Sequence, residues 1–238
     1  MKESRNRIRA FNIALRMQDE FEKGLPPGTV PNNALAIERR LSWQVAMLPY
    51  IEAVRLYQKF DLTKAWDDPR NREASSSEVP SFSYPGSVQR DGNGYPLGYY
   101  VGLAGLGTDG PLLSGDSPRA GFFAYDRATR WSDVSDGLSN TAIISEVEKD
   151  NGPWAAGGRP TIRSLTRQPY SSGPDGLGGG HAGGWFMGFA DGHTWFISEK
   201  VDPKVLEALA TIRGGEPVNK ESIGIQQSNE WESPIVTK

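Results

Sequence analysis

The chain contains no cysteine, only two histidines and no long apolar segment. The absence of cysteine excludes disulfides, thiolate metal sites and thiol nucleophiles, although it leaves the redox compartment open. No window approaches the roughly 18 consecutive apolar residues that a membrane span requires, and no apolar stretch of a secretory signal follows Met1. We therefore expect residues 1–238 to be soluble.

An excess of one charge sign is also missing. The 26 basic and 29 acidic residues leave a formal charge of −3, so nothing favours attraction to phosphate backbones or to anionic lipid. We expect no nucleic-acid partner. We also expect no membrane contact through residues 1–238.

Glycine, proline and tryptophan, in contrast, are abundant. The chain has 28 glycines, 17 prolines and seven tryptophans, and 37% of its residues are hydrophobic. Average usage is about 7% glycine and 5% proline, so this composition predicts many turns and long ordered loops around a real core. We predict one loop-rich α+β domain.

The first 23 residues show helical periodicity. Apolar residues recur at spacings of three and four from Glu3 to Lys23, which indicates an amphipathic helix. Gly24 is suited to a left-handed cap, and Pro26 and Pro27 cannot continue the helix. The predicted buried stripe consists of Ala10, Ala14, Met17 and Phe21, widened by Phe11 and Leu15.

Further elements follow at intervals. Residues 49–57 begin with a first-turn proline and predict a second helix. Residues 67–121 contain short aromatic pieces at 82–84 and 98–102, and this region is predicted to be irregular chain with one or two strands. The apolar, β-branched segment 141–147 predicts a buried strand. Asp202-Pro203 predicts the start of a C-terminal helix with Leu206 and Leu209 on its apolar face, ended by Gly214-Gly215.

The segment 185–198 carries the clearest local pattern. Two aromatic and β-branched runs flank Asp191-Gly192, which is typical of a two-residue type I′ hairpin turn. With that loop Gly188 lies opposite Trp195, whose ring can cover the glycine backbone. The other face then holds Trp185, Met187, Phe189 and Phe196. We predict that this hairpin is the centre of an antiparallel sheet, with a helix covering at least one side.

Five groups of residues, in a fixed order, resemble the His-x9-Asp-Gly family of prepilin-type proteins. That family is expanded in planctomycete bacteria, and its domain is of unknown function. The resemblance spans about residue 4 to residue 216. The groups are Leu25-Pro26-Pro27-Gly28; Ser42-Trp43 with Leu48-Pro49-Tyr50-Ile51-Glu52; Leu56-Tyr57 with Phe60-Asp61 and Trp66; Val134 to Thr141; and His181, nine residues, then Asp191-Gly192.

The resemblance implies a pilin or type II secretion pseudopilin plan. In that plan 1–24 is the second half of a stem helix, 25–216 is a pilin-like head and 217–238 is an extended or mobile tail. The signal and the apolar half of the helix are absent from this sequence, so membrane contact would come only through that missing segment. The implied role is structural, in an extracytoplasmic surface or secretion assembly whose partners are similar subunits or further copies of this chain.

The motif residues have ordinary structural explanations. Asp136, Gly137 and Asn140 belong to a turn before a strand, and Asp191 and Gly192 to the hairpin turn. His181 marks the entry to the strand that follows, and neither histidine lies in a recognised catalytic or zinc motif. We predict no catalytic or metal-binding residue. A hydrolase that uses a His181–Asp191 pair is kept as a hypothesis to be tested.

A second function class comes from the aromatic residues. Tryptophan rings stack on apolar sugar faces, so Trp43, Trp66 and Trp154 are candidates for a carbohydrate or solute site. Calcium needs several oxygen ligands at close quarters, and its candidates, Asp91-Gly92-Asn93-Gly94 and Asp67-Asp68 with Asn71, lack the regular alternation of a calcium loop. We expect no cofactor, with calcium as the alternative.

Overall fold

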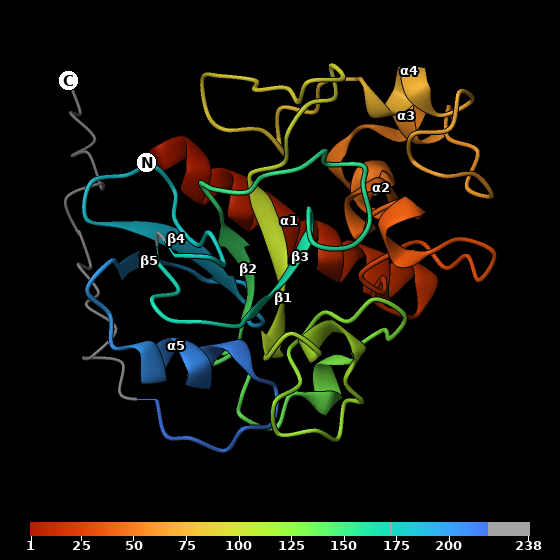
Figure 1. Ribbon diagram of the computed structural model, residues 1–238. Coiled ribbons are helices and arrows are strands. Elements are labelled where there is room, and N and C mark those ends of the chain that lie inside the picture. The colour runs from red at the N-terminus through yellow and green to blue at the C-terminus, as the bar shows by residue number, and fades with distance from the viewer. Residues whose placement is uncertain (172, 219–238) are drawn as a thin grey trace, which may run out of the picture.

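The computed structural model describes residues 1–171 and 173–218. Within them the chain forms an α+β fold in which helices cover both faces of one sheet (Figure 1). Apart from residues 217 and 218, the predicted tail 217–238 lies outside the described residues.

The sheet has five strands in the order β3-β1-β2-β4-β5. The pairs β1–β2, β2–β4 and β4–β5 are antiparallel, but β1 and β3 are parallel, so the sheet is mixed and the prediction of an antiparallel sheet is wrong. Strand β2 is central and the hairpin β4–β5 forms one edge, so the prediction that the hairpin is the centre of the sheet is wrong. The strands are β1 (Tyr100–Leu106), β2 (Ala142–Glu146), β3 (Ile162–Leu165), β4 (Gly184–Phe189) and β5 (Thr194–Ser198).

Two helices cover opposite faces of this sheet. Helix α1 (Lys2–Glu22) lies behind it in Figure 1, and helix α5 (Pro203–Ala210) lies against the other face. As predicted, Pro203 begins α5 and the Asp202 side chain caps it, accepting a hydrogen bond of 2.9 Å from Lys204 N. The helix ends at Ala210, before Gly214-Gly215.

The predicted second helix at 49–57 is broken into short pieces. They are a 3₁₀ turn (Leu48–Ile51) and α3 (Val54–Tyr57), and α2 (Trp43–Met47) comes directly before them. Glu52 has a φ of 63° and interrupts the helical path between them. The remaining short elements are α4 (Arg72–Ser75) and the 3₁₀ turns Ile37–Arg39, Gly110–Leu112 and Trp131–Asp133.

Helix α1 is amphipathic, but the stripe it buries differs from the predicted one. Of the predicted residues Phe11, Ala14 and Leu15 are buried, whereas Ala10, Met17 and Phe21 are exposed, Phe21 by 70%. Two apolar stripes overlap on this helix, and periodicity does not reveal which one meets the sheet. The left-handed residue that ends α1 is Lys23, at φ 57°, and not Gly24.

The buried stripe of α1 contains polar side chains. Ser4, Asn12 and Gln18 are at most 8% exposed. Both amide atoms of Asn12 and Gln18 Oε1 have no hydrogen-bond partner among the described residues. Helix α5 buries Leu206, Leu209 and Ala210. None of its residues has a buried side-chain nitrogen or oxygen atom without a hydrogen-bond partner.

The hairpin exists, but its register is shifted by one residue from the prediction. Phe189 N donates to His193 O (3.0 Å) and Gly192 N to Phe189 O (2.9 Å), so the loop has three residues. Gly192 alone has a positive φ, of 102°, as in a type I turn followed by a left-handed glycine. Trp195 therefore opposes Met187, and Phe196 opposes Phe186 on the α1 face. Gly188 is covered by α1, because a Cβ there would lie 2.5 Å from Ile8.

Candidate functional site

His181 pairs with Glu146 at the end of strand β2. Its Nε2 lies 3.2 Å from Glu146 Oε1, and the other carboxylate oxygen accepts a hydrogen bond of 2.8 Å from Phe186 N. The side chains of His181 and Glu146 are 7% and 3% exposed. A carboxylate oxygen accepts hydrogen bonds, so this contact suits the tautomer of His181 whose Nε2 is the donor. The pair joins β2 to the loop that enters β4.

The walls around this pair are close and largely aromatic. The rings of Phe186 and Phe196 lie 5.6 Å and 6.4 Å from the imidazole. Gly179 passes so near the carboxylate that a Cβ there would lie 2.2 Å from Glu146 Oε2. Tyr100 is fully buried nearby, and burial, with Glu146 second, raises the pKa of its hydroxyl.

This geometry is that of a buried pair closed off from solvent. A histidine held by a carboxylate can exchange protons with a substrate, but only where the free ring edge is open to it. Here both side chains are almost completely enclosed. Sequence reasoning missed Glu146. The available signal was a carboxylate in a mostly apolar buried strand, because buried acids are rare unless they are paired.

The other motif residues lie at the opposite end of β4. Six residues of extended chain separate the two ends, which is roughly 20 Å. Asp191 Oδ1 accepts from His193 N at 3.1 Å and also contacts His193 Nδ1. Its own N–H donates to Leu138 O at 3.1 Å. His181 and Asp191 therefore do not form a pair, and the hydrolase hypothesis loses its geometric basis.

The turn 136–140 ties this end of the sheet to the segment after α5. Asp136 Oδ2 accepts from Gly214 N at 2.7 Å, and its Oδ1 accepts from Gly215 N at 3.0 Å. Gly137 has a φ of 93°, and Asn140 Nδ2 donates to Asp136 O at 2.9 Å. Asp136 is thus a clamp for the C-terminal loop as well as a turn residue, a partnership that local sequence does not reveal.

The candidate aromatic platform is not assembled. Trp43 and Trp154 are 0% and 1% exposed, and their indole N–H groups donate to Thr161 O and Ser77 O. Both rings belong to the core and present no face to a sugar, which corrects their assignment as candidate ligand-binding residues. Trp66 is half-buried, with its N–H donating to Glu38 O at 2.9 Å.

The calcium alternative gains no support from the described residues. Residues 1–171 and 173–218 contain no group of three or more acidic or histidine side chains that could hold a metal ion. Asp91 Oδ1 accepts hydrogen bonds from Asn93 N (2.9 Å) and Tyr95 N (2.8 Å). One carboxylate oxygen of the candidate loop is therefore bonded to backbone N–H groups.

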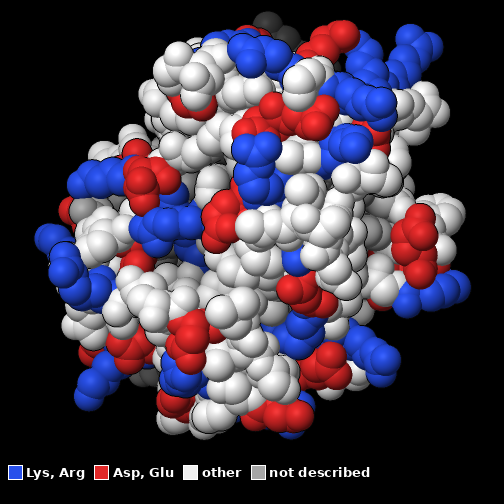
Figure 2. Space-filling model, turned by 45° about the vertical axis from the view of Figure 1, so that its right-hand side comes forward, with Lys and Arg blue, Asp and Glu red and all other residues white. Residues whose placement is uncertain are grey.

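Charges are mixed on the face that Figure 2 shows, where basic and acidic side chains alternate without a large patch of one sign. This arrangement lacks the basic stripe that marks a nucleic-acid interface. Among the described helices none has the length and apolar character needed to cross a bilayer.

An open cleft of about 440 Å³ lies where the chain leaves α1, and we call it the stem-exit cleft. Gln18 and Glu22 of α1 form one side, and Tyr50 and Tyr57 lie among its other lining residues. Tyr50 Oη donates to Glu22 Oε1 at 3.0 Å, and burial, followed by this bond, raises the pKa of Tyr50 to about 12. Prolines complete the walls, namely Pro26, Pro27, Pro31 and Pro49.

Comparison with protein families gives a match over most of the chain. A family model described as a protein of unknown function (DUF1559) matches residues 2–164, which include α1 and the strands β1 to β3. No curated protein and no solved structure matches the chain.

Proposed function

The chain belongs to the DUF1559 family of unknown function, and from that premise we propose that it is a non-enzymatic, pilin-like or pseudopilin-like subunit of an extracytoplasmic surface or secretion assembly. In the native protein, an apolar helix that precedes residue 1 would anchor it. Copies would then associate through α1, the stem.

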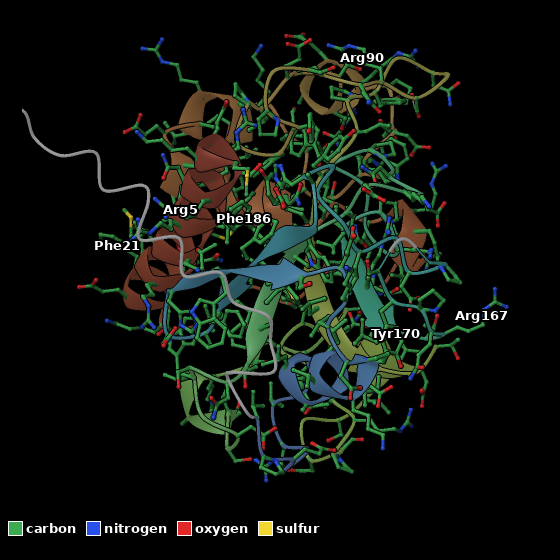
Figure 3. All side chains as sticks on the ribbon, turned by 90° about the vertical axis from the view of Figure 1, so that its left-hand side faces the viewer. Arg5, Phe21, Arg90, Arg167, Tyr170 and Phe186 are labelled. Carbon is green, nitrogen blue, oxygen red and sulfur yellow. The ribbon has the colours of Figure 1, made fainter. Side chains whose placement is uncertain are left out.

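One observation carries this proposal: large apolar side chains occupy the outer face of α1. Ile13, Met17 and Phe21 are 60%, 38% and 70% exposed, and they share one side of the helix. Figure 3 shows Phe21 pointing away from the sheet. Contiguous apolar surface on a helix that is already packed on its own head is typical of a contact with another helix. The enclosed His181–Glu146 pair also favours a structural role over a catalytic one.

The anchor is tested by the reading frame upstream of residue 1 and by fractionation of cells that express it whole. We expect a prepilin-type signal, an apolar helix and recovery of the protein with membranes or the cell surface. A frame that encodes neither segment would overturn the pilin-like assignment.

The stem contact is tested with the double variant Ile13→Ser/Phe21→Ser. We expect it to lower self-association, measured by sedimentation velocity, because it removes the apolar stripe. Leu112→Ser is the matched control, since Leu112 is also 70% exposed but lies on the head. Equal association of both variants would remove α1 from the contact.

A further inference from the structure

Strand β5 forms one edge of the sheet (Figure 1). In an antiparallel pair, alternate residues of a strand turn their backbone groups toward the neighbouring strand, and the others turn theirs away. Phe189 N donates to His193 O in the β4–β5 hairpin, so the residues of β5 that bond β4 are Trp195 and Ile197. The backbone N–H groups that point away from the sheet, and that have no acceptor among the described residues, belong to Thr194, Phe196 and Ser198.

The strand at the opposite edge of the sheet, β3, is enclosed, whereas β5 is not. All four residues of β3 are buried, and the Arg163 guanidinium of this strand donates to Lys149 O at 2.9 Å and to Asp175 O at 2.7 Å. Four of the five residues of β5 are half-buried instead. Natural sheets protect an exposed edge with charged residues, prolines or a covering segment. The five residues of β5 include no charge and no proline, so this edge is suited to pairing with another strand.

The sequence of β5 is complementary to itself when two copies of the strand run antiparallel. With Phe196 opposite its counterpart in the second copy, Thr194 lies opposite Ser198. Trp195 then lies opposite Ile197 on the α5 face. Hydroxyl groups thus meet each other on the α1 face, and apolar side chains meet on both faces, which are the kinds of cross-strand pair that stabilise sheets. This register also pairs all three residues whose backbone groups point outward.

We propose that two copies of this chain join by antiparallel pairing of their β5 strands, centred on Phe196, into one continuous sheet. Phe196 exchanges two backbone hydrogen bonds with its counterpart, and Ser198 N donates to Thr194 O. At both ends of the paired segment the imidazole of His193 lies opposite the carboxylate of Glu199. The contact is isologous, since the same surface serves both copies.

The two-fold axis of this pair is normal to the sheet. Helix α1 therefore covers the same face of the continuous sheet in both copies, but its direction is reversed from one copy to the other. The two stems lead away from each other, so this contact joins subunits that face one another and differs from the stem contact of the proposed function. That setting rests on the proposed function, whereas the contact itself uses only residues of β5 and its ends.

Amide hydrogen exchange, followed by NMR in the full chain, tests the pairing directly. The N–H groups of Phe196 and Ser198 should exchange about tenfold or more slowly at high protein concentration than at low, because only the pair protects them. The N–H groups of Trp195 and Ile197, which bond β4, are the internal control and should stay protected at both concentrations. Exchange at Phe196 and Ser198 that does not change with concentration would overturn the proposal. If it is slow throughout, the edge is paired within its own chain.

Charged side chains on the paired edge test which strand is the partner. Thr194→Lys/Ser198→Lys and Thr194→Glu/Ser198→Glu each place like charges opposite one another in a pair of identical copies. We expect each to weaken self-association about tenfold or more, measured by sedimentation velocity. Thr108→Lys/Ser114→Lys adds the same charges at exposed positions outside β5 and should leave association unchanged. An equimolar mixture of the Lys and Glu variants of β5 should restore the dimer, and a mixture that remains monomeric while the wild type dimerises would refute the self-pairing.

Disulfide trapping defines the register, since the chain has no cysteine of its own. Thr194→Cys is mixed with Ser198→Cys, because the Cα atoms of such a hydrogen-bonded pair lie about 5.5 Å apart, within the range of a disulfide. Thr194→Cys alone is the matched control, as its two sulfur atoms would be roughly 13 Å apart along the strands. We expect a linked dimer of the two variants in the mixture and little in the control. Equal yields would overturn the register.

The Ile13→Ser/Phe21→Ser variant separates this contact from the stem contact of the proposed function. It removes the apolar stripe of α1 and leaves β5 unchanged, so the concentration-dependent protection of Phe196 and Ser198 should persist. Thr194→Lys/Ser198→Lys should in turn keep the association through α1. Loss of the protection in Ile13→Ser/Phe21→Ser would show that the edge does not pair by itself, and would overturn this proposal while retaining the stem contact.

Discussion

The α1 face and the α5 face of the sheet bury side chains of different kinds. Helix α5 contributes leucine and alanine to one apolar cluster with Trp185, Met187 and Ile197. Helix α1 places an aromatic cluster around Phe11 beside the unpaired polar atoms of Asn12 and Gln18. Buried polar atoms without partners cost free energy, so α1 gains less from its buried area than α5. The longer helix, α1, therefore gains less free energy for each unit of area that it buries against the sheet.

The largest expected losses of stability come from removing the large apolar side chains that α1 and α5 bury against the sheet. The ring of Phe11 lies 5.3 to 5.7 Å from the rings of Tyr100, Phe82 and Trp43, so Phe11→Ala should cost about 3–5 kcal/mol. Leu209→Ala, on α5, should cost about 2–5 kcal/mol. Denaturant unfolding measures both. Phe21→Ala, on the outer face of α1, is the control and should change stability by about 0.5 kcal/mol or less.

Next in size is the pair that closes the α1 face near Phe186. His181→Ala should cost about 3 kcal/mol, because it leaves the buried Glu146 carboxylate with one partner fewer. In a double-mutant cycle with Glu146→Gln, the double variant should lose less stability than the two single variants together. Additive losses would mean that the two side chains do not interact.

A smaller effect of opposite sign should follow from repacking a polar residue of α1. Asn12→Leu replaces an amide without partners by an apolar group of similar size and should raise stability by about 1 kcal/mol. Leu206→Asn makes the reverse change on α5 and should lower stability by several times that amount, about 3 kcal/mol. If Asn12→Leu proves destabilising, the amide has a partner and the contrast between the faces weakens.

The smallest effect is a pH dependence that the two faces share. Tyr170 Oη donates to Glu207 of α5 at 2.6 Å, as Tyr50 does to Glu22 of α1. Burial, and then these bonds, raises the pKa of both hydroxyls to about 12, against about 10 in the unfolded chain. The folded state therefore holds more protons between pH 10 and 12, and stability falls as pH rises through that range.

The alkaline loss is measured by unfolding at several pH values, with tyrosinate absorbance followed alongside. Tyr50→Phe and Tyr170→Phe should each remove part of the fall in stability between pH 10 and 12. Between pH 7 and 9 the dependence of stability on pH should not change. If stability falls between pH 10 and 12 as steeply in a variant as in the wild type, the tyrosine that was replaced ionises in the folded state as it does in water.

Elements with strong local signals could be predicted from the sequence. The stem helix, strand β2, the hairpin and the capped start of α5 all depend on periodicity, β-branching or turn residues within one short segment. The register of the hairpin could not be predicted, because Asp-Gly occurs both in two-residue loops and in three-residue loops with a left-handed glycine. That difference moved Trp195 and Phe196 to opposite faces from those expected.

Features that depend on distant partners escaped prediction. His181 meets Glu146 across 35 residues, and Asp136 meets Gly214 across 78. Strand β3 is short and pairs in parallel with β1, a partnership without a local sequence pattern. The buried stripe of α1 was misplaced for a related reason: the helix has two apolar faces, and only the sheet decides which one is inside.

The Asp136 clamp has a mechanical consequence. Its carboxylate takes two backbone N–H groups from Gly214 and Gly215, and its own segment leads directly into the central strand. A force applied to the chain after Gly215 therefore acts on Asp136, and through it on β2, before it acts on the last turn of α5. In a single-molecule stretching experiment these two hydrogen bonds would resist the separation of the C-terminal loop from the sheet. Asp136→Ala would lower the force at which α5 separates from the sheet.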